Sequence, residues 1–109
     1  MTKLEHLPKL KTADECQTMT DVRHEVDRID RILVELVAER QSFMGAAARI
    51  KESRDMVYDA PRIEDVIQKV LKSAEVVGLS PNIAEPVWRL LITQCIEFEY
   101  SRFDQTHKI

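Results

Sequence analysis

Glycine, proline and clustered metal ligands are scarce in this sequence, and each shortage excludes a class of protein. Two glycines and four prolines, set against many Ala, Leu, Glu, Lys and Arg residues, indicate an all-α protein. No apolar run approaches the roughly 18 residues that cross a membrane, so no membrane partner is expected. The three histidines are scattered and the two cysteines lie far apart, so the sequence predicts neither a metal site nor a metal cofactor.

An excess of basic charge is also missing. The formal net charge is -3, and both signs are interleaved along the chain, which argues against a nucleic-acid partner. Residues 1–20 are polar and lack the apolar stretch of a signal peptide. We therefore expect a cytoplasmic protein in which Cys16 and Cys95 are reduced thiols. A length of 109 residues predicts one folded domain.

The apolar pattern divides the chain into a flexible N-terminal arm, residues 1–18, and a helical domain, residues 19–109. The domain begins with a stripe of apolar side chains at steps of three or four, with one step of seven after Leu36: Val22, Val26, Ile29, Leu33, Leu36, Phe43, Ala47 and Ile50. With Thr20 or Asp21 as its cap, this helix is predicted to run about 33 residues, or roughly 50 Å. A compact domain of this size has a radius of gyration of only about 13 Å. A helix this long calls for a partner helix, which suggests a dimer.

Two shorter helices are predicted to follow. One begins near Pro61, with Asp59 or Ala60 as its cap, and ends at Gly78. Ser80 and Pro81 mark the start of the next, whose predicted apolar face comprises Val87, Leu90, Leu91, Cys95 and Phe98. Pro86 lies inside that helix and is expected to loosen or kink its first turns. The sequence indicates three helices, one long and two shorter, and no strands.

Two cations occupy the apolar stripe of the long helix. Arg40 stands where the step after Leu36 requires an apolar residue, and Lys51 follows eleven residues later. At about 100° per residue, that spacing returns Lys51 to within about 20° of Arg40. An unpaired buried charge is costly, so an anion is expected to meet them. The alternative is that both side chains extend their charged groups to solvent at the edge of the core, or that these groups pair with acidic residues of another helix.

Several segments, taken in order and at matching spacing, resemble the all-α chorismate mutase family. The resemblance covers about residues 20–103 and rests on these pieces: Asp21–Arg23, Val26–Asp30, Leu36–Arg40, Lys51, Val57–Arg62 and Gly78–Ser80. It implies an intertwined homodimer of three-helix chains with two equivalent sites. It also implies rearrangement of chorismate to prephenate, a step of aromatic amino-acid biosynthesis that needs no cofactor.

The resemblance assigns a role to each matching residue. Arg23 is expected to reach the partner's site and bind one substrate carboxylate, and Arg40 is expected to bind the other. Lys51 is expected to contact the ether oxygen and a carboxylate. Asp59 is expected to bind the ring hydroxyl, and Arg62 is expected to assist in substrate binding. Glu99 is expected to face the ether oxygen. Cys95 stands one turn before Glu99, at a position where the family often has a small polar residue. Ile63 departs from the family, which often has glutamate there.

Two alternatives stay open. An isochorismate-pyruvate lyase, which forms salicylate, shares the fold and the cationic site, although the resemblance gives such lyases no acid at the position of Asp59. A non-catalytic, dimeric helical interaction module would also explain the long amphipathic helix. The intact set of Arg23, Arg40, Lys51 and Arg62 argues against this second alternative.

Overall fold

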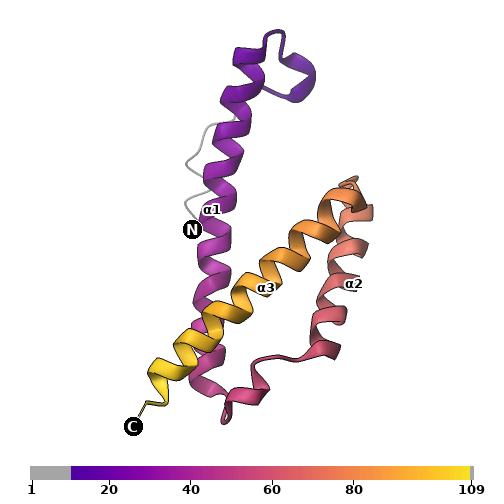
Figure 1. The fold of residues 1–109 in the computed structure, drawn as a ribbon. Helices are drawn as coiled ribbons and strands as arrows, with labels where there is room; N and C mark the ends of the chain where they lie inside the picture. The colour runs from indigo at the N-terminus through magenta and orange to yellow at the C-terminus, as the bar shows by residue number, and fades with distance from the viewer. Residues whose placement is uncertain (1–10, 109) are drawn as a thin grey trace. The chain divides into compact units, whose positions relative to one another are not determined.

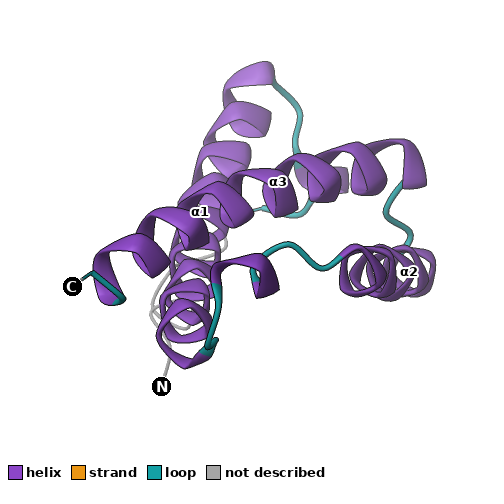
Figure 2. Cartoon of the chain, turned by 60° about the horizontal axis from the view of Figure 1, so that its bottom comes forward, coloured by secondary structure: helices purple, strands orange, loops and turns teal. Residues whose placement is uncertain are grey.

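The computed structural model describes residues 11–108, and every regular element in that range is helical (Figure 2). The elements are η2 (Ala13–Glu15), α1 (Met19–Ile50), η3 (Arg54–Met56), α2 (Ala60–Val77) and α3 (Pro81–Thr106). The prediction of one long and two shorter helices without strands is therefore confirmed over the described range. Residues 1–10 of the predicted arm lie outside it, and the flexibility of residues 1–18 stays a prediction.

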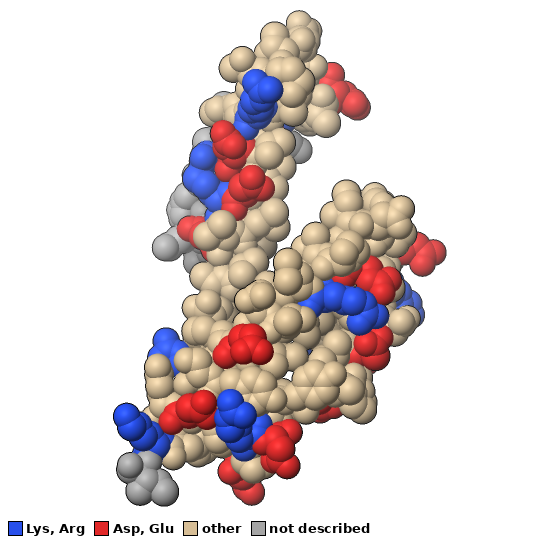
Figure 3. Space-filling model, in the orientation of Figure 1, with Lys and Arg blue, Asp and Glu red and all other residues tan. Residues whose placement is uncertain are grey.

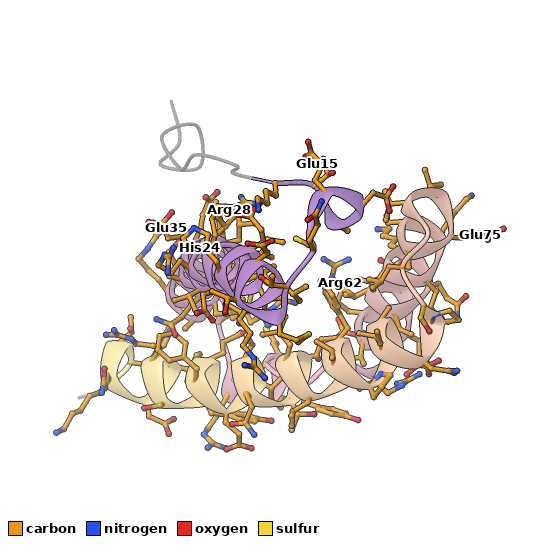
Figure 4. All side chains as sticks on the ribbon, turned by 90° about the horizontal axis from the view of Figure 1, so that it is seen from above. Glu15, His24, Arg28, Glu35, Arg62 and Glu75 are labelled. Atoms are coloured by element: carbon orange, nitrogen blue, oxygen red, sulfur yellow. The ribbon has the colours of Figure 1, made fainter. Side chains whose placement is uncertain are left out.

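The chain forms two compact units, which meet within α1 after Arg40, and each is described by itself. In the first unit, the segment before α1 is tied to the start of that helix. Lys11 Nζ lies 2.9 Å from Asp21 Oδ2, and the Gln17 amide donates to the same oxygen. The hydrogen bond from Lys11 lowers the pKa of the Asp21 carboxyl below its usual value. Figure 4 shows His24, Arg28 and Glu35 projecting from one side of α1.

The cap predicted for the long helix was wrong. The helix begins at Met19, before both predicted cap residues, Thr20 and Asp21. Thr18 provides the cap, because its Oγ1 accepts a hydrogen bond of 3.1 Å from the Asp21 amide. Thr18 and Thr20 are chemically equivalent as caps, and the ties of Asp21 to Lys11 and Gln17 favour the earlier start.

In the second unit, α2 and α3 form a hairpin whose ends match the predicted signals (Figure 1). Asp59 caps α2 by accepting from the Arg62 amide at 3.1 Å, and Ser80 caps α3 by accepting from the Asn82 amide at 3.2 Å. Gly78 ends α2 with a φ of 78°, a left-handed conformation that favours glycine. Its amide and that of Leu79 bond back to carbonyls of the last turn, which closes the helix end.

An arginine on α3 joins the two helices of this hairpin. The Arg89 guanidinium donates to both carboxylate oxygens of Glu64 on α2 and to Glu85 on its own helix. The hydrogen bonds from Arg89 lower the pKa of the Glu64 carboxyl below its ordinary value. On the face that Figure 3 shows, basic and acidic side chains lie next to one another over α3 and the adjoining part of α2.

The packed face of α3 differs from the predicted one. Its buried residues are Ala84, Ile92, Glu99 and Phe103. By contrast, Val87 and Leu90 of the predicted face are exposed. The helix carries apolar side chains around most of its circumference, so its sequence does not show which face meets α2. The helix is continuous through Pro86.

One buried cluster of the second unit is small and lies where the end of α1 meets α3 (Figure 1), and further buried side chains lie on α2 and α3. Ala48, Val57 and Phe103 are buried together, and Ile96 and Tyr100 pack against them. Because Ala48 has no bulky side chain, the α3 backbone can approach α1 closely at this point. This packing places the chain that follows α1, including Lys51, beside α3.

The predicted apolar stripe of α1 is exposed in the single chain. Among its members, Val22, Val26, Ile29, Leu36 and Ile50 are all exposed. Leu33 and Phe43, its larger side chains, are 50% and 63% exposed. Within residues 11–108 no helix is long and apolar enough to cross a membrane.

Candidate active site

A buried glutamate and the lysine that follows α1 form the centre of the candidate site. Lys51 Nζ donates to Glu99 Oε2 at 2.6 Å. The Glu99 side chain is 5% exposed and the Lys51 side chain 27%, so the ammonium group is reached from solvent more easily than the carboxyl group. A buried carboxylate requires a partner of opposite charge, and Lys51 supplies it.

Local structure fixes both members of this pair. The Lys51 amide donates to the Ala47 carbonyl at 2.9 Å, which extends the hydrogen bonding of α1 by one residue beyond Ile50. Glu99 belongs to the buried face of α3, four residues before Phe103 of the core. Lys51 therefore leaves the end of one helix and meets a carboxyl group fixed on another.

Two further predicted residues lie together at the start of α2. Asp59 Oδ1 is engaged by the Arg62 amide, and a carboxylate has a second oxygen that can accept another hydrogen bond. The Arg62 side chain is exposed and donates to Asp65 Oδ2 at 2.8 Å. Hydrogen bonds from Lys69 and then Arg62 lower the pKa of the Asp65 carboxyl. Figure 4 shows Arg62 and Glu75 toward opposite ends of α2.

The remaining predicted residues are placed on their helices as the sequence indicated. Arg23 is exposed on the first two turns of α1, and Arg40 is partly buried further along the same helix. Cys95 is partly buried, one turn before Glu99 on α3, and is not part of a disulfide. Cys16, which precedes α1, is not part of a disulfide either. The described residues contain no group of three or more His, Cys, Asp or Glu side chains able to hold a metal ion.

Ile63, the departure from the family pattern, lines a cavity of about 360 Å³ in the second unit. Its other lining residues come from the α2–α3 hairpin and the segment before it: Tyr58, Glu64, Arg89, Ile92, Thr93, Ile96, Glu97 and Tyr100. Neither Lys51 nor Glu99 belongs to this set. The isoleucine therefore packs beside α3 at a place where its apolar side chain has apolar neighbours.

Sequence analysis missed several contacts that surround Lys51. Arg54 Nε donates to Asp104 Oδ1 at 3.0 Å, and the Arg54 guanidinium lies 4.3 Å from the centre of the Tyr100 ring. His107 Nε2 lies 3.0 Å from the Ala48 carbonyl oxygen. The available signal was the spacing of Tyr100 and Phe103, which places them on one face of α3.

These contacts define a helical protein in which an ammonium group and a buried carboxyl group meet where α3 crosses the end of α1. The chain belongs to the chorismate mutase type II family, whose model matches residues 22–100. It is also 27% identical over 97 residues to the isochorismate pyruvate lyase of Pseudomonas aeruginosa, a match that covers 89% of this chain and 96% of that protein.

Proposed function

We propose that this chain is a chorismate mutase that converts chorismate to prephenate by a pericyclic rearrangement. The observation that carries the proposal is the pair of Lys51 and buried Glu99 in a chain of this family. The reaction breaks a carbon–oxygen bond and forms a carbon–carbon bond in one step, and it needs no nucleophile. The protein has to hold a flexible dianion in its reactive shape and stabilise the oxygen at which negative charge develops.

Binding of the dianion is assigned to cationic side chains. Guanidinium groups grip carboxylates through two parallel hydrogen bonds, and Arg40 and the partner's Arg23 are proposed to do so here. Arg62 is proposed to assist by exchanging its exposed bond to Asp65 for the substrate. Fixing the reacting ends close together can supply several kcal/mol, up to roughly 7–11 in the best intramolecular reactions.

Stabilisation of the transition state is assigned to Lys51 and Glu99. The two side chains bond to each other. A substrate ether oxygen between them would accept from the Lys51 ammonium group and from Glu99, provided that Glu99 is protonated. Both donors are held before the reaction begins, so they stabilise the developing negative charge more than the ground state. The second oxygen of Asp59 is proposed to accept the ring hydroxyl.

A homodimer is part of the proposal. The exposed apolar stripe of α1 and the small core support it, because a stable chain does not leave that many large apolar side chains in water. A partner that covers this stripe would also bring its own Arg23 to the site. The cytoplasmic location and the role in aromatic amino-acid biosynthesis stay predictions from the sequence.

An isochorismate-pyruvate lyase is the second candidate. The observation that favours it is the 27% identity to the lyase of Pseudomonas aeruginosa over almost the whole of both chains. Asp59 favours the mutase, because the family resemblance gives such lyases no acid at this position. The two reactions use the same cationic site, so their products have to distinguish them.

Incubation of the purified protein with chorismate and, separately, with isochorismate tests the proposal. We expect prephenate from chorismate as the dominant product. Pyruvate and salicylate from isochorismate as the dominant products would replace the mutase with the lyase. Turnover of neither substrate, together with no binding of a dianionic analogue, would instead favour the non-catalytic helical module.

A further inference from the structure

The last turns of α3 run beside the segment that follows α1 (Figure 1), and α3 contacts η3 there. Tyr100, Phe103 and Asp104 lie on one side of α3, and His107, its C-cap residue, follows seven residues after Tyr100. Phe103 packs against Ala48 and Val57, and Tyr100 and Asp104 hold Arg54. We call these four residues the α3 end face.

His107 makes the contact of this face with the end of α1. Its Nε2 atom lies 3.0 Å from the Ala48 carbonyl oxygen. Because a carbonyl oxygen can only accept, Nε2 must carry the hydrogen. The imidazole ring stacks on Phe103, with 3.9 Å between the ring centres and 22° between their planes. The stack sets the orientation of the ring, and the hydrogen bond is therefore held in direction as well as in length.

The acceptor of this hydrogen bond, the Ala48 carbonyl oxygen, lies in the last turn of α1. Ala48 belongs to the last four residues of α1, whose carbonyl groups lack the partners of a continuing helix. His107 supplies a donor from another element. The amide of Lys51, three residues later, closes the same turn by donating to Ala47. The adjacent carbonyl groups of Ala47 and Ala48 in the final turn thus each accept a hydrogen bond. Lys51 is the first residue after that turn.

The far side of Lys51 is held by the same face. Arg54 lies three residues beyond Lys51 and is bonded to Asp104 while stacked over Tyr100. Arg54 and Asp104 are both exposed, so their ion pair is a weak restraint. The bond from His107 to Ala48 is partly buried, which makes it the stronger tie of the two.

We propose that His107 is a positioning residue that sets the ammonium group of Lys51 against Glu99, acting through the Ala48 carbonyl and the last turn of α1. The inference rests on the proposed function for its effect on catalysis. It predicts that loss of the N–H donor lets this turn open and displaces the Lys51 ammonium group. A displacement near 1 Å can lower a rate by about 10- to 100-fold.

Two substitutions separate the hydrogen bond from the ring stack. His107→Phe keeps a ring against Phe103 and removes the donor, whereas His107→Gln keeps an N–H near the position of Nε2 and removes the ring. Lys108→Gln, at an exposed neighbouring position, is the matched control. The first readout is hydrogen exchange of the Lys51 amide relative to amides of α2, measured on the whole protein by NMR.

We expect exchange at Lys51 to accelerate selectively in His107→Phe and to stay near the wild-type rate in His107→Gln and Lys108→Gln. In chorismate turnover, kcat of His107→Phe should fall by about 10- to 100-fold, more than KM rises, because the donors at the ether oxygen act in the transition state. Unchanged exchange at Lys51 in His107→Phe, or equal acceleration throughout the chain, would overturn the inference. An inactive wild-type protein would refute the proposed function alone, since the exchange measurement needs no substrate.

Discussion

Glu99 is the residue whose surroundings differ most from those of an ordinary surface carboxyl group. It is buried on α3 and bonded to Lys51 at 2.6 Å. In this arrangement each charge compensates the other. A dianionic substrate changes the balance, since it competes for the ammonium group and is repelled by an ionised carboxyl group. A neutral hydrogen-bond donor at this position would resolve both conflicts.

We therefore predict that Glu99→Ala lowers kcat for chorismate turnover by about 10²–10³-fold and that Glu99→Gln retains much more activity. The glutamine amide still donates a hydrogen bond, whereas alanine cannot. The measurement is kcat and KM for both variants, with the exposed Glu97→Gln as the control on the same helix. If Glu99→Ala kept the wild-type kcat, Glu99 would have no part in the reaction.

The sequence did not predict which individual residues of the site contact one another. The helical pattern singled out Lys51, the resemblance alone named Glu99, and 48 residues separate the two along the chain. No periodicity indicates their contact, which depends on the approach of α3 to Ala48. His107 was missed for a similar reason, because its acceptor is a backbone carbonyl of a distant helix and leaves no mark on the pattern of side chains.

At the element scale, helix ends were predictable where the signal is local. Asp59, Gly78 and Ser80 each act on the adjacent turn, and all three do what the sequence predicted. The start of α1 was misplaced by two residues, because several polar residues compete there and tertiary ties select Thr18. The packed face of α3 was misassigned because a helix that is apolar on most sides gives no preferred direction.

The two glycines offer a matched test of these elements. Gly78 has a φ of 78°, so Gly78→Ala should lower the free energy of unfolding by about 1–2 kcal/mol. Gly45 lies inside α1, where an added Cβ meets no atom within 4 Å, so Gly45→Ala should raise it by about 0.5–1 kcal/mol. Urea unfolding at one fixed protein concentration measures both. Changes of the same sign would contradict the assigned helix boundaries.

At the scale of the whole molecule, the single chain leaves its longest apolar stripe uncovered. Its buried hydrophobic side chains include three alanines, and Ile67 is its largest fully buried side chain. A core of this size contributes little stability by itself. Sequence analysis predicted the stripe correctly and inferred a partner from its length. The proposed dimer adds a functional reason for the partner, since Arg23 of the other chain would complete each site.

Complementation between two inactive variants tests this account most directly. In a Lys51→Ala homodimer and in an Arg23→Ala homodimer, both sites lack one essential cation. A heterodimer of the two, purified through different tags, should regain one intact site and therefore about half of the wild-type rate of prephenate formation per dimer. Recovery of that rate is the result that the shared mutase site predicts. A heterodimer as inactive as its parents would contradict it, because both cations would then act within one chain.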